Sequence, residues 1–190
     1  MDPFWLYNSI VAYDPISVVK FDPFLEVLVV GTNNGWIRVF GMKSLEIRAS
    51  FRAHRIAVVS VICCNFGILS LSKDQASLHT HNGVPVSNGE FARLSENLVD
   101  LSIVKEQLSD TLRNRLAFTD MCFDSSEFDQ QQRAQRLVVS TNSHLLFVFD
   151  LNFIGVKSKH SVPHIFSTGD INTVGGISCL AYVERKKYLL

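Results

Sequence analysis

A hairpin pattern that occurs twice constrains the fold of this chain more than any other feature. Val27 to Phe40 comprises two apolar runs joined by Asn33-Asn34-Gly35. The Asn-Gly pair supplies the positive φ angles that a tight hairpin turn needs. The same pattern returns 109 residues later, without a gap, as Leu137 to Asp150. A repeat of this kind indicates an array of similar supersecondary units, each packed against the next.

Further apolar segments separated by turn residues fill out this array. Strands are predicted at Ile16 to Phe21, Val27 to Thr32, Trp36 to Phe40, Leu45 to Phe51, Ala57 to Cys64, Ile68 to Ser72, Leu78 to His81, Leu116 to Phe123, the two arms of Leu137 to Asp150, Val156 to Ser161, Ile177 to Val183 and Tyr188 to Leu190. Four short antiparallel strands in about 40 residues are typical of a β-propeller blade. The sequence therefore predicts an all-β fold of the propeller class.

The two hairpins also follow the order of residues in a WD repeat. That repeat places Ser or Thr at the end of its second strand, an Asp-Gly-like turn next, and apolar-x-Val-Trp-Asp on its third strand. Phe replaces Trp in both hairpins, and a histidine precedes the second unit. The predicted repeat positions are Thr32, Asn34, Gly35, Phe40 and His54, followed by Thr141, Phe149 and Asp150. We therefore predict a WD-repeat-type propeller.

The repeat spacing predicts a partial propeller over 16–190, preceded by a lead-in at 1–15. The predicted blades are 16–54, 55–98, 116–162 and an incomplete 177–190, with insertions at 99–115 and 125–135. Within 87–115, leucine spacing favours an amphipathic helix, whereas an alternating stretch favours a short strand. Closure usually takes about seven blades and this chain encodes about three and a half. We expect an N-terminal fragment, a truncated isoform or an incomplete gene model, which should self-associate or aggregate.

Charge and cysteine usage narrow the class of protein. Eighteen basic residues balance 18 acidic ones, so no overall field favours nucleic acid or an anionic membrane. The longest apolar run, Ile56 to Cys64, is too short to span a bilayer, and the acidic N-terminus does not resemble a signal peptide. All four cysteines lie in apolar segments, and we expect reduced thiols: Cys63, Cys64, Cys122 and Cys179. We expect a cytoplasmic protein, with the nucleus as a further location.

Several groups of polar residues were considered for chemistry. An acidic cluster, Asp124, Glu127 and Asp129, lies in a Gln-rich insertion where a solvated loop is expected. His79 and His81 project from one side of a strand and lack a third ligand at readable spacing. A basic surface would comprise Arg113, Arg115, Lys157, Lys159, Arg185, Lys186 and Lys187, for which ordinary solvation is the simpler interpretation. No phosphate loop, nucleophile elbow or carboxylate pair occurs, so we predict no catalytic, cofactor-binding or metal site.

Several short motifs occur between about residues 14 and 155: Phe21-Asp22, Leu28 to Gly31, Ser50-Phe51, Gly67 to Ser72, Gly83-Val84-Pro85, Leu137-Val138 and Phe149-Asp150. Together these motifs resemble the N-terminal propeller of the catalytic subunits of poly(A)-nuclease deadenylation complexes. Two departures are Val29-Val30, where that family usually has Leu-Trp, and His81-Asn82, where it usually has a basic pair. A divergent relative is therefore expected.

The resemblance implies a scaffold in mRNA poly(A)-tail shortening, with P-bodies as a further location. In that family a C-terminal nuclease domain carries four acidic catalytic residues, and none of it lies in this chain. The family propeller helps to dock a dimeric pseudokinase-like regulatory subunit and to present poly(A) ribonucleoprotein. Those are the partners implied here, without a membrane or a small-molecule substrate. The alternative from the repeat alone is a generic WD-type protein-interaction module in an unrelated assembly, and an independent enzyme is the least favoured hypothesis.

Overall fold

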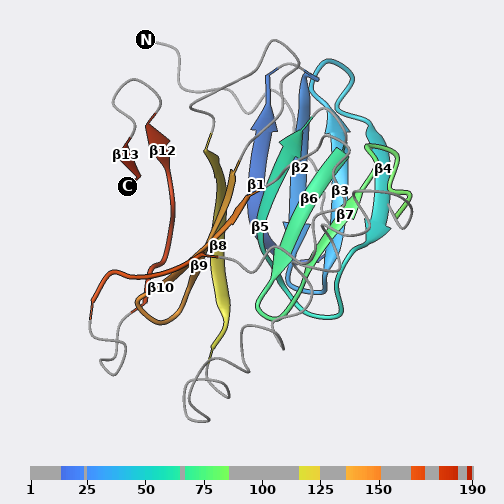
Figure 1. The fold of residues 1–190 in the computed structure, drawn as a ribbon. Helices are drawn as coiled ribbons and strands as arrows, with labels where there is room; N and C mark the ends of the chain where they lie inside the picture. Colours follow the sequence, from blue (N-terminus) through green and yellow to red (C-terminus); the bar gives the residue numbers. More distant parts are fainter. Residues whose placement is uncertain are drawn as a thin grey trace, which may run out of the picture.

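The computed structural model describes residues 14–23, 25–64, 67–85, 116–124, 136–150, 164–169, 176–183 and 188–189. Within these ranges every regular element is a strand, and the strands form four antiparallel sheets (Figure 1). No helix long and apolar enough to cross a membrane is found in the described part of the chain. The fold is all-β, as predicted from the strand pattern.

Each sheet is built from strands that follow one another in sequence. The first contains β1 (Ile16–Asp22), β2 (Val27–Thr32), β3 (Trp36–Gly41) and β4 (Ile47–Arg52) in that order. The second contains β5 (Val58–Cys64), β6 (Gly67–Ser72) and β7 (Ala76–His79). The third contains β8 (Phe118–Asp124), β9 (Arg136–Thr141), β10 (Leu145–Asp150) and β11 (His164–Ser167). The fourth pairs β12 (Tyr182–Val183) with β13 (Tyr188–Leu189).

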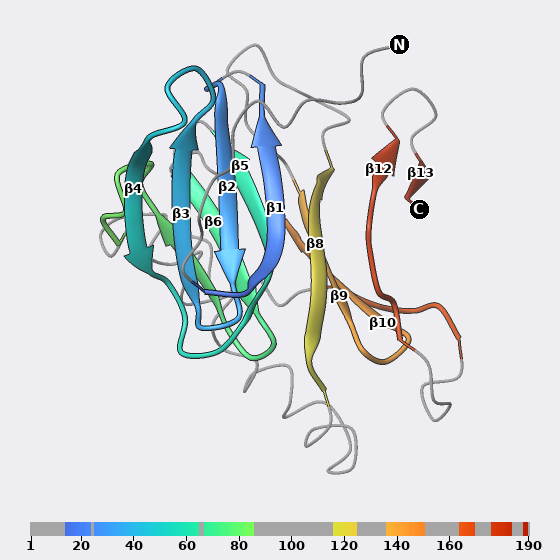
Figure 2. The ribbon, with the colours of Figure 1, turned by 180° about the vertical axis from the view of Figure 1, so that it is seen from behind.

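The first strands of the sheets are neighbours in space. β5 contacts both β1 and β8, and β8 also contacts β12, so these strands form one side of the array (Figure 2). β1, β5 and β8 share an irregularity two residues from their start: the pairs Ile16↔Thr32, Val58↔Ser72 and Phe118↔Thr141 each precede a register shift. The shared bulge gives a residue-by-residue correspondence between the three sheets. We call β1, β5 and β8 the inner strands.

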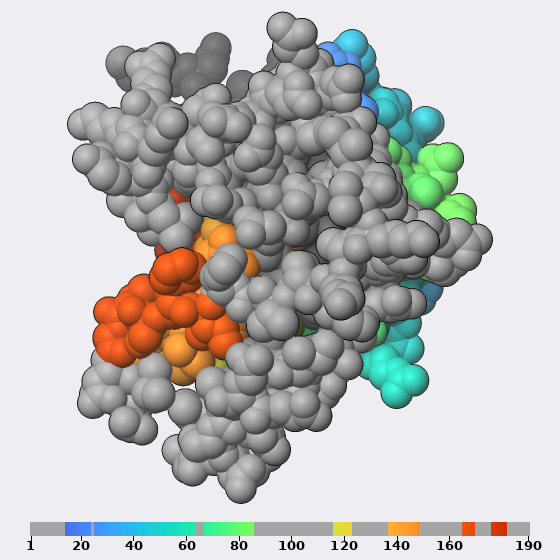
Figure 3. All heavy atoms as spheres, viewed as in Figure 1, coloured from blue at the N-terminus to red at the C-terminus, as the bar shows by residue number. Residues whose placement is uncertain are grey.

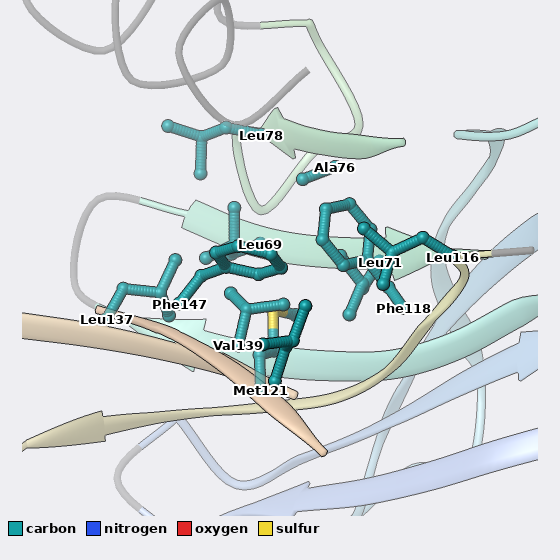
Figure 4. Packing of buried hydrophobic residues seen from close by; sticks show 11 residues of the cluster. Leu69, Leu71, Ala76, Leu78, Leu116, Phe118, Met121, Leu137, Val139 and Phe147 are labelled. Carbon is teal, nitrogen blue, oxygen red and sulfur yellow. The ribbon is translucent and has the colours of Figure 1, made fainter. Parts of the chain in front are cut away.

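Two apolar clusters hold neighbouring sheets together. The first joins β2, β3 and β4 to β5 and β6 through Val27, Val29, Ile37, Val39, Ala49, Val58, Val61 and Ile68. The second joins β6 and β7 to the third sheet, where Leu69 and Leu71 lie against Met121, Val139 and Phe147 (Figure 4). Since β6 contributes Ile68 to one cluster and Leu69 to the other, both faces of the second sheet are buried.

The strand predictions succeeded in the two hairpins and needed correction elsewhere. β2 has the predicted bounds, and β9 and β10 pair as the second hairpin. The fourth strand of the third sheet, however, is β11 at His164–Ser167, whereas it was predicted at 156–161, which lies outside the described residues. β11 lies at the surface in the view of Figure 3. The polar composition of 156–161 suggested an outer strand there, and composition alone did not locate the strand at His164–Ser167.

A second correction concerns β4, which was predicted to present one apolar face. A register shift between Val39 and Phe40 falls opposite Ile47, and Ile47 is exposed whereas Ala49 is buried. Leu45 precedes the strand and has a positive φ of 57°. The predictions for 1–13, 86–115, 125–135, 151–163 and 184–187, including the helix-or-strand alternative and every member of the proposed basic surface, lie outside the described residues.

Candidate functional site

The turn of the first hairpin is clamped to the linker between the first two sheets. The carbonyl of Gly35 accepts hydrogen bonds from the amides of Ala53 and His54, at 3.0 and 3.1 Å. Gly35 has a φ of 81°, and a Cβ built on it would lie 2.1 Å from the carbonyl oxygen of His54. Only glycine allows both the backbone angle and this approach. The turn therefore fixes where the linker leads into β5.

Threonines at the ends of β2 and β9 close their hairpins in related ways. The buried Thr32 accepts a hydrogen bond at Oγ1 from the amide of Trp36, at 3.2 Å. The buried Thr141 donates from Oγ1 to the carbonyl of Leu145, at 3.0 Å. Both contacts join residues four positions apart across a turn. The two predicted repeat positions thus occupy equivalent places, and their hydroxyls stabilise the turns.

A buried polar network lies where the linker meets the second sheet. The Nε2 atom of His54 lies 2.9 Å from the Oγ of Ser70 on β6, and that hydroxyl lies 3.0 Å from the Oγ of Ser77 on β7. We call His54, Ser70 and Ser77, together with the neighbouring His79, the junction cluster. The hydrogen bonds tie the linker to two strands, so the cluster positions the second sheet relative to the first.

His79, the last residue of β7, is the fourth member of the junction cluster. Its ring packs against Phe51 of β4 with a centroid separation of 4.6 Å. It pairs with Ile68, as Phe40 pairs with Leu28 and Phe149 with Leu137. His79 therefore replaces the aromatic residue of the other two hairpins. It stacks on a ring, and no group of three or more potential metal ligands, with or without His81, occurs in the part of the chain the structure describes.

Burial keeps the junction histidines neutral. It lowers the pKa of His54 to about 4, helped by repulsion from His79 and opposed by Asp74, and it also lowers the pKa of His79. Within the described residues, Nδ1 of each ring has no hydrogen-bond partner. Protonation would place a charge in a buried site and a donor at Nδ1, for which the described residues provide no acceptor, so both rings favour the neutral form.

Acid should therefore destabilise this junction. Because the pKa of His54 is lower in the folded state than its ordinary value of 6.5, the unfolded chain binds more protons between pH 6.5 and about 4. The stabilisation is fully present above pH 6.5 and is lost progressively as the pH falls to about 4, by up to about 3 kcal/mol. Urea unfolding at pH 7.5 and 5 measures this loss. His54→Gln should flatten the profile, and an unchanged profile would show that His54 does not titrate as a buried group.

The Ser70–His54 pair resembles the serine–histidine pair of a catalytic site, but its position gives it a structural role. Both side chains are buried, and the serine hydroxyl is shared with Ser77. A catalytic serine needs access to substrate and a third group that orients its histidine. Nδ1 of His54 faces no such group among the described residues. The geometry supports positioning of sheets and gives this serine no route to a substrate.

In the first and third sheets, other residues occupy the register position that Ser77 holds in the second sheet. In the first sheet Arg38 occupies the register position of Ser77, and its Nη2 donates to Asp14 Oδ2 at 2.8 Å. The exposed Asn34 donates to the other carboxylate oxygen of Asp14 at 3.0 Å, and these hydrogen bonds lower the pKa of Asp14. In the third sheet the place is taken by the buried Phe147. One architectural position thus carries an ion pair, a histidine–serine network and an aromatic ring.

A single carboxylate links three successive sheets along the inner strands. Asp120 on β8 accepts a hydrogen bond from the Ser60 hydroxyl of β5 at 2.6 Å. Its other oxygen accepts from the amide of Leu180, just before β12, at 2.8 Å. The first oxygen also accepts from the amide of Met121. Asp120 therefore serves as the polar connection through the second, third and fourth units.

The predicted repeat positions do not gather at one surface. Phe40 is buried in the first sheet, Asn34 lies in the exposed turn, and Phe149 and Asp150 belong to β10. Cys63 and Cys179 carry free thiols, and burial raises the pKa of Cys63 to about 12. Sequence reasoning missed Ser70, Ser77 and Asp120. A signal existed for Ser70, since this serine stands where the first and third sheets have Val30 and Val139.

Comparisons with known proteins bear on the fold. No protein-family model matches the sequence, and no curated protein matches it either. Among solved structures, the chain is similar to the WD40 domain of Pan2 from Neurospora crassa, with a TM-score of 0.57 and 18% identity over 93% of this chain and 44% of that one. It also aligns with the computationally designed Ika8 protein, with a TM-score of 0.49 and 12% identity over 88% and 40%. The chain thus spans less than half of either structure, and it has the fold of a partial WD40-type β-propeller.

Proposed function

We propose that this chain is a non-catalytic propeller scaffold that acts in mRNA poly(A)-tail shortening. The observation that carries the proposal is the alignment of 93% of the chain with the Pan2 WD40 domain. The motifs from Phe21-Asp22 to Phe149-Asp150 point the same way by their resemblance to deadenylase propellers. In this role the chain contributes surface for a pseudokinase-like regulatory subunit and leaves the nuclease reaction to another domain.

The buried chemistry is consistent with a scaffold. Within the junction cluster His54, Ser70 and Ser77 are joined by hydrogen bonds, and His79 packs on Phe51, so these side chains position sheets. Fold and function are separable in propellers, so a generic WD-type interaction module in another assembly is the second candidate. The similarity to the Pan2 WD40 domain, at 18% identity, supports the fold alone and so is compatible with that candidate as well.

Affinity purification of the tagged chain from cells that contain the regulatory subunit tests this function. We expect that subunit to co-purify in stoichiometric amount, and the purified chain alone to leave poly(A) RNA unshortened. A tagged propeller of unrelated sequence is the control for non-specific capture. Stable recovery of other proteins without the regulatory subunit would contradict the deadenylation role and support the generic module.

A further inference from the structure

The fourth strand of the first sheet, β4, has one edge that pairs with no strand in the described part of the chain (Figure 1). The Ala53 amide donates to the Gly35 carbonyl, and these two residues continue the register of β3 with β4. In an antiparallel ladder, hydrogen-bonded and non-bonded pairs alternate, so the amides and carbonyls of Ser50 and Arg52 point away from β3. Both residues are exposed. The edge therefore presents backbone donors and acceptors to a further strand.

The outer strands of the second and third sheets do not present a comparable edge. On β7 the side chains of Ala76 and Leu78 are buried, and His79 forms a bridge with Pro85. The strand β11 has four residues, and it carries neither lysine nor arginine. By contrast, β4 has six residues and carries two arginines. The β4 edge is thus both longer and more basic than that of the other outer strands.

Three exposed arginines accompany the β4 edge: Arg48, Arg52 and, on the linker, Arg55. Arg48 and Arg52 donate to backbone carbonyls at 3.2 to 3.5 Å, which fixes their side chains without neutralising them. The ion pairs among the described residues lie elsewhere, so none of the three has a carboxylate partner there. Between residues 45 and 55 the sequence has one acidic residue, Glu46. The edge therefore carries a local excess of positive charge.

The other face of β4 selects among ligands for this edge. Ile47 is 46% exposed and Phe51 is half-buried, and they alternate along the strand with the arginines. An added strand places alternate side chains on the two faces, so one set would meet arginines and the other set apolar residues. Nucleic acid would satisfy the charges but not the backbone groups. A second copy of β4 would place arginines opposite arginines, which is unfavourable.

We propose that the β4 edge binds an extended acidic segment of another protein, in which carboxylates alternate with apolar residues. The segment adds a fifth strand to the first sheet, through hydrogen bonds to the outward groups of Ser50 and Arg52. Its carboxylates pair with the arginines, whose guanidinium groups suit carboxylate oxygens. The inference uses only the β4 edge and is independent of the deadenylation role.

A labelled, acetylated peptide with three Glu-Val repeats, which matches the six residues of β4, is the probe. Fluorescence anisotropy with the purified chain should show saturable binding. Ser50→Pro removes the outward amide without removing a hydrogen bond to β3, so it should raise the dissociation constant by about 10-fold or more. Ser50→Ala keeps the amide and is the matched control, with an expected change below about 2-fold. Urea midpoints close to that of the parent would show that both variants are folded.

A pair of charge reversals tests the electrostatic part of the proposal. The Arg55 side chain makes no hydrogen bond or ion pair within the described residues, and Arg55→Glu should weaken peptide binding by about 5-fold or more. Lys20→Glu makes the same change in net charge on β1, at the opposite end of the sheet, and should have little effect.

Four results would overturn the proposal. They are no saturable binding below about 1 mM, equal binding of a Lys-Val peptide, equal effects of the two charge reversals, and a Ser50→Pro variant that binds like the parent. Binding of an oligouridylate in place of the peptide would assign the edge to nucleic acid and also contradict the proposal. Because only the purified chain and the probe are present, the result does not depend on the regulatory subunit.

Discussion

Replacing Gly35 by alanine should lower the stability of the chain by about 3 kcal/mol or more. Two costs combine at this position. The φ of 81° is unfavourable for any residue with a Cβ, and the added methyl group would lie 2.1 Å from the carbonyl oxygen of His54. That carbonyl belongs to the backbone, so relief requires the linker to move away from the turn. The move would break the hydrogen bonds from Ala53 and His54 to the Gly35 carbonyl.

Thermal unfolding measures the effect of Gly35→Ala, with an expected fall in Tm of about 6 to 12 °C. Gly169→Ala is the matched control. A Cβ at Gly169 would meet the His144 side chain at 3.2 Å, a contact that a small side-chain shift relieves. The control should therefore change Tm by no more than about 2 °C. Equal Tm values for the two variants would contradict the clamped turn.

The second large effect is expected at Asp120. Its removal leaves the Ser60 hydroxyl and the amides of Met121 and Leu180 without their acceptor. Hydrogen bonds to a carboxylate contribute about 1.5 to 3 kcal/mol each, and solvent replaces part of this where the site is accessible. We expect Asp120→Ala to cost about 3 kcal/mol, and Asp120→Asn to cost less because one acceptor oxygen remains.

Asp74→Ala is the control for Asp120→Ala. It distinguishes the loss of a link between sheets from the loss of a carboxylate in general. Asp74 accepts one hydrogen bond from Ser72, two residues away within the same turn, at 2.7 Å. Asp74→Ala should therefore cost about 1 kcal/mol and leave the other sheets unaffected. Asp120→Ala should also speed hydrogen exchange at the Leu180 amide by about 10-fold or more. Unchanged exchange at Leu180 would show that the carboxylate does not hold the fourth unit.

The local structure of the hairpins could be predicted from the sequence, because it depends on residues that are close together in the chain. Gly35 determines the first turn through its positive φ of 81°, whereas Asn34, which was predicted to share that conformation, does not adopt a positive φ. The alternating apolar positions that follow the turn determine which side chains face the next sheet. The repeat at Leu137 to Asp150 then indicated the architecture. β11 was misplaced because it is only four residues long, His164–Ser167, which is too short to show a periodic pattern.

The contacts between sheets were harder to predict. Asp120 meets Ser60 and Leu180, each 60 residues away in sequence, through a shared bulge that no turn signal marks. His54 was identified from its place before the second unit, but its partners Ser70 and Ser77 depend on how β6 and β7 face the linker. The unpaired edge of β4 likewise follows from the order of strands in the first sheet, which strand periodicity does not specify.

A double-mutant cycle between Ser60→Ala and Asp120→Ala tests most directly the central claim, that successive sheets pack as blades through their inner strands. The two residues lie on different sheets and are joined by a 2.6 Å hydrogen bond. Urea unfolding of the parent, both single variants and the double variant should give a coupling free energy of about 1.5 kcal/mol. Effects that add within about 0.5 kcal/mol would contradict the packing of the second sheet against the third.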